Sequence, residues 1–281
     1  MDITKLKYTK DSHEVPLRNV KTERQPQVVA DDQESHSVKG VPLYEKTEGT
    51  LSISLIVVIS GGTVREKNFF RAIQPPQFKF TKILFKSKDN QGWSPLQMED
   101  FWNSCKALNS IEDEDGQKIG IFDADKVFLV SDVDDFRDQL VQVLGRKEAA
   151  DGSQWIISNP CFEIWLYYCY GFNNPEKDLY ALNADVVHRR SGHLKTLNGQ
   201  LIKGGADPTL SIYGMKEAIH RSIEHYEEDV HGIPVLYATQ MHILAQCLIN
   251  TTNQRNNEFD RFLSQQAEAI KKWKSKFQHE G

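Results

Sequence analysis

The sequence predicts an α/β fold, a mainly parallel β-sheet flanked by helices, and three observations lead to this prediction. Short apolar runs rich in β-branched and aromatic residues recur between Leu51 and Ile157, as the buried strands of a parallel sheet require. Most of these runs end in polar, glycine or acidic residues and are followed by a segment with helical spacing of its apolar positions. After Gly171 no convincing strand occurs, so the remainder predicts a helical C-terminal extension.

The composition is that of a globular chain with a polar arm at its start. Of 281 residues, 39% are hydrophobic and 26% are charged, and the net charge is −5, so only local basic patches could serve a nucleic-acid partner. No apolar run approaches the ~20 residues of a membrane helix, Met1–Lys5 lacks a signal-peptide core, and the four cysteines form no C-x-x-C pair. We therefore expect a cytoplasmic protein with no membrane partner. The predicted domains are a disordered N-terminal arm (1–50), an α/β domain (51–170) and the helical extension (171–281).

The first half of the predicted α/β domain contains two strands and two helices. Leu51–Ile59 becomes continuously apolar, as a strand that enters the centre of a sheet does. The glycines after Ser60 permit a tight turn, and Thr63 is placed to cap a helix that Pro75 and Pro76 stop. The elements expected here after the first strand are a helix over 65–73, a strand over 78–85, a helix over 95–108 and a solvated acidic connector over 112–116.

The second half repeats this alternation around the apolar run 126–130, which predicts a buried strand. A helix from Asp134 or Asp135 to Leu144 would follow it. The segment 161–170 is apolar nearly all round, which predicts a helix that is buried on most sides. The remaining expected elements are a strand over 155–157, helices over 179–190, 215–226, 237–250 and 258–277, and a connection over 194–208.

Three acidic residues, Asp132, Asp134 and Asp135, follow the strand predicted at 126–130. In open parallel sheets ligands bind beyond the carboxyl ends of the strands, and residues two apart on an extended chain point the same way. Carboxylate oxygen atoms suit Mg²⁺ and Mn²⁺, so Asp132 and Asp134 could share one such ion, with Asp135 beside them. The alternative is that they only end the strand and begin the next helix.

Two glutamates at neighbouring turns are candidates to join this site. Glu66 could reach the metal or take a proton from an attacking water, or it could belong only to a capping box. Glu163 could complete the acidic site, or it could only favour the positive end of its own helix. Both readings of each residue are open from the sequence.

Other residues are candidates for phosphate or supporting contacts. Gly61 and Gly62 precede a helix and could hold a phosphate with their N–H groups, or form an ordinary strand-to-helix turn, and Arg65 lies near the same end. Asn159 could contact a phosphate or cap the helix whose first turn would hold Pro160. A basic segment further on is either a solvated helix end or a nucleic-acid contact: His188, Arg189, Arg190, His193 and Lys195.

Three segments together resemble the RloB family, which belongs to the Toprim group of folds. They are residues 60–70 (SGGTVREKNFF), 132–136 (DVDDF) and 158–166 (SNPCFEIWL), and the resemblance covers about residues 51 to 170, more loosely to about 250. It implies a Toprim-like fold in which a glutamate near the first strand's end and an Asp-x-Asp bind Mg²⁺ and support cleavage or transfer at phosphodiesters. It also implies a setting in bacterial restriction and abortive-infection loci, often with an ATPase partner.

The chain departs from the family's pattern at the first strand. Many relatives carry Glu-Gly at its end, whereas this chain has Ser60-Gly61-Gly62. Glu66 matches the second acidic position of that segment, a turn further on. Either Glu66 substitutes for the missing glutamate, or the site has lost its general base, or Glu163 completes it from the neighbouring strand end.

The resulting prediction is a Mg²⁺- or Mn²⁺-dependent nuclease that acts on DNA or RNA in bacterial anti-phage defence. Glu66, Asp132 and Asp134 would be catalytic, and Asp135 would be a further metal ligand. The alternative is a non-catalytic regulatory or scaffold subunit that binds an ATPase partner, which the missing first-strand glutamate favours. A primase-like nucleotidyl transferase would use the same acidic residues.

Overall fold

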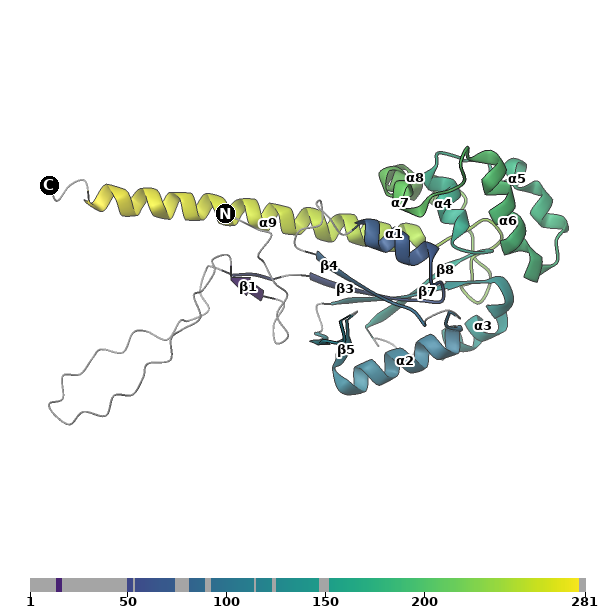
Figure 1. Ribbon diagram of the computed structural model, residues 1–281, viewed down its shortest axis with the longest axis horizontal. Coiled ribbons are helices and arrows are strands. Elements are labelled where there is room, and N and C mark those ends of the chain that lie inside the picture. Colours follow the sequence, from purple (N-terminus) through teal and green to yellow (C-terminus); the bar gives the residue numbers. More distant parts are fainter. Residues whose placement is uncertain are drawn as a thin grey trace. The chain divides into compact units, whose positions relative to one another are not determined.

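The computed structural model describes residues 14–16, 50–52, 54–73, 81–88, 92–113, 115–122, 125–146 and 152–277. The chain forms two compact units, one over Ser54–Asn256 and one made of Met1–Ile53 and Asn257–Gly281. The larger unit contains the sheet and most of the helices, and all of the residues discussed below as a site belong to it (Figure 1).

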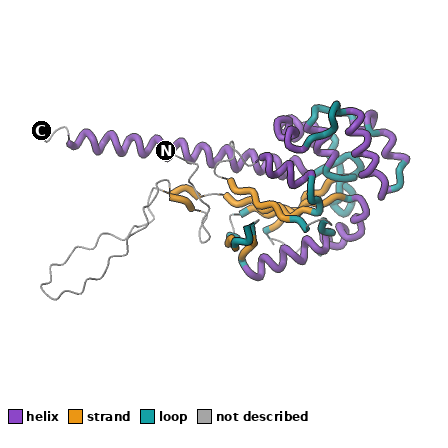
Figure 2. The backbone as a smooth tube through the Cα atoms, in the orientation of Figure 1, coloured by secondary structure: helices purple, strands orange, loops and turns teal. Residues whose placement is uncertain are grey.

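Four parallel strands form the central sheet, in the order β4-β3-β7-β8 (Figure 2). They are β3 (Ser54–Ser60), β4 (Thr81–Lys86), β7 (Lys126–Asp132) and β8 (Ser153–Ser158). β3 and β7 lie in the middle, which explains why their apolar runs do not alternate with polar residues.

Helices cover both faces of this sheet. α1 (Arg65–Ile73) lies on one face, and α2 (Pro95–Leu108) and α3 (Arg137–Gly145) lie on the other (Figure 1). The short helix η2 (Asp134–Phe136) joins β7 to α3. The chain runs outward from β3 to β4, returns across β3 to β7, and then continues to β8, so its direction across the sheet reverses between β3 and β7.

Aromatic packing under α1 joins the sheet to the helical region. Phe69 is fully buried, and its ring lies edge-on to the rings of Phe70, Phe162 and Trp165 at centroid distances of 5.2, 5.6 and 6.5 Å. Trp165 belongs to α4 (Glu163–Cys169), in which every residue is buried. The nearly all-apolar segment is therefore an internal helix, as the sequence predicts.

The chain after α4 is helical. Its elements in order are α5 (Pro175–Asp178), η3 (Tyr180–Ala184), α6 (Val187–Leu201), α7 (Pro208–Ser211), η4 (Ile212–Gly214), α8 (Met215–Glu224) and α9 (Met241–Phe277). Residues of α6, α8 and the start of α9 pack into the same hydrophobic core as α1 and α4. In this described region the only strand-like pairing consists of two isolated bridges, Ser158 with Thr239 and Glu228 with Pro234.

The structure confirms the predicted α/β class, the parallel sheet and the helical C-terminal region, and it corrects three local predictions. The helix expected over 179–190 is wrong, because η3 ends at Ala184 and α6 begins at Val187. The expected connection over 194–208 is wrong, because α6 continues to Leu201: Leu194 and Asn198 are buried, and this packing outweighs the low helix propensity of Gly192 and Gly199. The helices expected over 237–250 and 258–277 are one helix, α9, since no proline or glycine interrupts the polar stretch between them. The acidic connector is a turn with exposed residues, as expected, and it joins the two strands of a hairpin, β5 (Ser110–Glu112) and β6 (Lys118–Gly120).

Other predictions concern residues at the margins of the description. The expected disordered arm lies almost wholly outside the described residues, and its described pieces, β1 (Glu14–Pro16) and β2 (Thr50–Ser52), pair antiparallel. Pro75, Pro76 and the start of the strand expected from Phe78 also lie outside them. The four cysteines are free thiols, three of them buried. Among the described helices none is long and apolar enough to span a membrane.

Replacing Phe69 with alanine tests whether the aromatic packing under α1 supports the fold. We expect Phe69→Ala to lower the free energy of unfolding by about 3–5 kcal/mol, because a fully buried ring leaves a cavity. Asn68→Ala, at an exposed position of the same helix, should change it by less than about 0.5 kcal/mol. Urea unfolding of both variants provides the comparison, and equal stabilities would contradict this account of the core.

Candidate acidic site at the sheet's switch point

The candidate site lies where the carboxyl ends of β3 and β7 are adjacent. The reversal of chain direction between these two strands is the position at which open parallel sheets bind ligands. The Gly61 N–H donates to the Val130 carbonyl oxygen at 3.0 Å and so joins the two strand ends. The predicted Asp132 is the last residue of β7.

The turn after β3 brings Glu66 back to the strand ends. Glu66 is the second residue of α1 and is 7% exposed. Its carboxylate lies over Gly62 so closely that a Cβ atom on Gly62 would come within 1.9–2.1 Å of the carboxylate atoms. The side chain thus folds over the glycine turn instead of extending from the helix surface. The N–H groups of Gly61 and Gly62, candidates to hold a phosphate, donate instead to the Val130 carbonyl oxygen at 3.0 Å and to Ser60 Oγ at 3.1 Å.

Burial and neighbouring charges raise the pKa of Glu66 to about 7. Burial is the largest cause, and repulsion from the Glu163 carboxylate adds to it. The helix's own N–H at Glu66, then Lys195 and Arg65, oppose the shift. Glu66 would therefore change its charge near neutral pH, unlike an ordinary surface glutamate.

Asp132 lies in the same field of negative charge. Burial raises its pKa well above the usual range, and repulsion from Glu66, Glu163 and Asp134 raises it further. One interaction opposes the shift: the Phe162 N–H donates to Asp132 Oδ1 at 2.8 Å. Phe162, whose N–H binds Asp132, directly precedes Glu163, and Arg65, which pairs with Glu163, directly precedes Glu66, so contacts through adjacent residues link the three acids.

Glu163 is the most heavily paired acid of the group. It lies in the first turn of α4, and its side chain is 4% exposed. Its Oε1 atom is 3.3 Å from Arg65 Nε and 3.6 Å from Lys195 Nζ. Arg65 also donates through Nη1 to the Ala206 carbonyl oxygen at 3.2 Å. Two cations from α1 and α6 therefore partly neutralise the acidic group.

Asp134 and Asp135 differ in their surroundings. Asp134 has a positive φ of 22°, and its buried Oδ1 atom has no hydrogen-bond partner among the described residues. Burial raises its pKa; the nearby Ser191 hydroxyl favours the charged form, although the two groups do not have the geometry of a formed hydrogen bond. Asp135 is exposed and acts on the site only through its charge, which raises the pKa of Asp134 further.

Asn159 has a structural role that the sequence did not reveal. Its Nδ2 donates to the Pro234 carbonyl oxygen at 2.8 Å, its N–H donates to Ala238 at 3.0 Å, and its own carbonyl accepts from the Tyr237 N–H at 3.0 Å. The prediction that Asn159 caps the next helix is wrong, because α4 begins at Glu163 and Pro160 lies before it. Asn159 instead fixes the loop that precedes α9 against the end of β8.

The residues of the acidic site fit a hard divalent cation in their chemistry. They offer oxygen atoms only, burial and then repulsion from neighbouring carboxylates raise the pKa values of Glu66 and Asp132, and one buried carboxylate oxygen of Asp134 has no partner among the described residues. Within the described part of the chain, however, no three carboxylate, imidazole or thiol groups form the arrangement of a metal site. Binding of an ion would therefore require at least one side chain to move.

The sequence did not predict that α6 contributes to the site. Ser191, Lys195 and Asn198 lie at helical spacing on its inner face, and Asn198 Nδ2 donates to the Glu163 carbonyl oxygen at 2.9 Å. The sequence indicates Lys195 only as part of a basic segment. The spacing of these three polar residues beside Leu194 is the sequence signal that indicates a shared helix face. The predicted connection over 194–208 excluded a helix there and so hid this signal.

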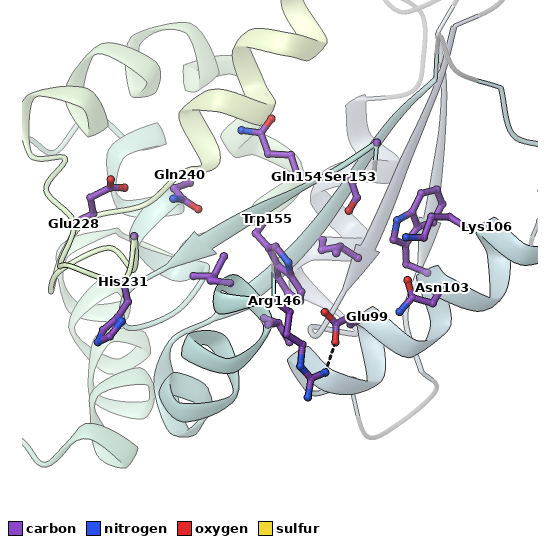
Figure 3. A pocket seen from close by; sticks show the side chains of 16 residues that line it. Glu99, Asn103, Lys106, Arg146, Ser153, Gln154, Trp155, Glu228, His231 and Gln240 are labelled. Atoms are coloured by element: carbon purple, nitrogen blue, oxygen red, sulfur yellow. Dashed lines mark hydrogen bonds and ion pairs between the residues drawn. The ribbon is translucent and has the colours of Figure 1, made fainter. Parts of the chain in front are cut away.

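A separate cavity of about 1050 Å³ lies between α2, α3 and β8 (Figure 3). Trp102, Lys106, Arg146 and Trp155 are among the residues that line it, and Arg146 Nη1 donates to Glu99 Oε2 at 2.8 Å. None of the acidic residues described above lines this cavity. The predicted chemistry and this cavity are therefore in different places.

Comparison with known proteins gives one match. The family model described as RloB-like protein matches residues 56–248, which is more than half of the chain and includes both α6 and the acidic residues. No curated protein and no solved structure matches the chain.

Gly62→Ala tests whether Glu66 folds over the turn. The added Cβ would displace the flexible Glu66 side chain rather than the backbone, so the Glu66 carboxyl should move toward water. We expect its pKa to fall from about 7 toward the ordinary value of 4.5, as measured by carbon NMR of the glutamate carboxyl groups. Gly199→Ala is the matched control, since a Cβ there meets nothing within 4 Å, and it should leave this titration unchanged. An unaltered Glu66 titration in Gly62→Ala would contradict the proposed contact.

The raised pKa of Glu66 also predicts a pH dependence of stability. The folded protein holds this proton more tightly than the unfolded chain, so the stabilisation is complete below pH 4.5 and is lost as the pH rises through about 7. Glu66→Gln remains neutral and should be more stable than the native protein at pH 8, by ~1–3 kcal/mol, but similar at pH 4.5. Urea unfolding between pH 4.5 and 8 measures the difference. Parallel pH profiles for the two proteins would show that Glu66 is not buried as described.

Proposed function

The chain belongs to the RloB-like protein family, and we propose that its acidic site cleaves phosphodiester bonds of DNA or RNA with Mg²⁺ or Mn²⁺. The observation that carries this proposal is the placement of carboxylates at the switch point of the sheet: Glu66 lies over Gly62 after β3, and Asp132 ends β7 and accepts the N–H of Phe162, the residue before Glu163. Like charges are costly to hold together, and a divalent cation would relieve their repulsion. The resemblance to Toprim folds, in which a glutamate and an Asp-x-Asp bind Mg²⁺, supports the same assignment.

The proposed roles follow from the surroundings of each residue. Asp132 and Asp134 would hold the cation, because they lie at the end of β7 and one Asp134 oxygen is buried without a partner. The cation would supply Lewis-acid stabilisation of charge on the phosphate and would lower the pKa of an attacking water. The Phe162 N–H fixes the orientation of Asp132 through Oδ1 and leaves its other oxygen available.

Glu66 is suited to accept the proton of the attacking water. A general base works best when its pKa lies near the operating pH, and that of Glu66 is raised to about 7. Its position over Gly62 supports this role, because the side chain of a residue one turn later returns to the strand end that lacks the glutamate of the family pattern. In this proposal Glu66 substitutes for the glutamate of the family pattern, and Glu163 positions the cations beside it.

The cellular setting is also part of the proposal. The family resemblance supports a role in bacterial anti-phage defence and an ATPase partner protein. One observation favours the second candidate, a non-catalytic subunit: Arg65 and Lys195 already pair with Glu163, and no three ligand groups of the described residues meet as in a metal site. The two candidates differ in whether a divalent cation binds.

Substitution of the acidic residues tests the enzyme. With Mg²⁺ or Mn²⁺ present, we expect cleavage of tRNA, single-stranded DNA or duplex DNA, and Asp132→Asn or Glu66→Gln should reduce the rate by at least ~100-fold. Asp138→Asn, at an exposed position in the first turn of α3, is the matched control and should retain activity. The assay is run with the purified protein alone and with its ATPase partner, and with EDTA as a further control.

A cation titration separates the two candidates. The nuclease proposal requires that Mg²⁺ or Mn²⁺ raise the melting temperature of the native protein and have a smaller effect on Asp132→Asn. If the protein shows neither cleavage nor cation-dependent stabilisation, the nuclease proposal is wrong and the non-catalytic scaffold subunit is favoured.

A further inference from the structure

We propose that Lys195 of α6 and Arg65 of α1 form a phosphate-binding pair at the mouth of the acidic site, so that the helical region supplies part of the substrate site. This inference deepens the proposed nuclease function and rests on it for the nature of the substrate, a nucleic-acid backbone. Neither the family pattern nor the sequence assigned Lys195 to the site.

The first argument is the geometry of the two cations. Arg65 Nε and Lys195 Nζ lie 3.3 and 3.6 Å from the same Glu163 oxygen, so both are close enough to contact one phosphate group. They come from different elements, α1 and α6. The Ala206 carbonyl oxygen accepts a hydrogen bond from Arg65 of α1, and the Asn198 amide of α6 donates one to the backbone of α4. A guanidinium and an ammonium fixed in this way are a common means of binding phosphate oxygens.

The second argument is the order of charges from solvent inward. The side chains of Arg65 and Lys195 are 39% and 48% exposed, whereas that of Glu163 is 4% exposed. An approaching anion therefore meets positive charge first, although the acids behind it would otherwise repel a phosphate. Attraction also reaches Lys195 from Asp132 and Glu66, which places its ammonium within the field of the proposed catalytic residues.

The third argument is that this part of the site contains unpaired buried groups. Ser191, one helical turn before Lys195, is 5% exposed, and its hydroxyl has no hydrogen-bond partner among the described residues. The buried Asp134 Oδ1 is unpaired in the same region. Buried polar atoms without partners are costly. The Ser191 hydroxyl can donate to a phosphate oxygen or its hydration water, whereas the Asp134 oxygen can only accept and would face the cation or a water.

The alternative is that Arg65 and Lys195 form only a structural ion pair with Glu163. The two cases differ in their dependence on salt. A side chain that contacts a backbone phosphate releases a counterion when the nucleic acid binds. Affinity falls as salt rises, and removing such a side chain makes the plot of log affinity against log salt concentration less steep by ~0.7–0.9. A structural ion pair affects protein stability but not this slope.

The test measures binding without cleavage. The affinity of a fluorescent single-stranded oligonucleotide is measured by anisotropy from 50 to 300 mM salt, with Ca²⁺ in place of Mg²⁺, for the native protein, Lys195→Met and Arg65→Met. Methionine keeps much of the aliphatic stem of each side chain while removing the charge. We expect each variant to bind at least ~5-fold more weakly at the lowest salt concentration and to show the reduced slope.

Arg189→Met is the matched control, because it removes an exposed cation from another face of α6. Its slope should equal that of the native protein. Native slopes in both Lys195→Met and Arg65→Met would overturn the inference, even if the protein cleaves nucleic acid. Reduced slopes in a protein that binds but never cleaves would support the phosphate pair and reject the nuclease instead.

Discussion

The crowding of like charges at the ends of β3 and β7 is the constraint on which this site depends. Burial raises the pKa values of Glu66 and Asp132, the Glu163 carboxylate raises them further, and each of the three acids is held by a different interaction. Glu66 lies against the backbone of its own helix start, Asp132 accepts the Phe162 N–H, and Glu163 pairs with Arg65 and Lys195. Such an arrangement costs stability, so it is expected mainly where a function requires it. This is why acids with perturbed pKa values in one place indicate a functional site.

The parallel sheet and its carboxyl-end acids could be predicted from the sequence because the signals are local. Continuous apolar runs marked β3 and β7, and Asp132 followed directly after one of them. Glycines in the turn after β3 indicated that some group approaches the backbone closely there, but they did not identify the group. The structure shows that this group is the Glu66 carboxylate, which reaches back over Gly62.

The contributions of α6 and Asn159 could not be predicted in the same way, because they depend on contacts between distant parts of the chain. Asn198 and Glu163 are joined across 35 positions, and Asn159 and Pro234 across 75. Two glycines weakened the helical pattern of α6, and only its burial against α4 shows why the helix forms. Local propensity is a weak guide where tertiary packing decides the outcome.

The adjacency of Arg65 and Glu66 has a consequence for how such a sequence can evolve. One helical turn supplies both the carboxylate that lies over Gly62 and the guanidinium that pairs with Glu163. Point substitutions can alter these two side chains one at a time. An inserted or deleted residue between Gly62 and Arg65 would instead rotate α1 by about 100° and misdirect both together. The connection between β3 and α1 should therefore tolerate changes of sequence far better than changes of length.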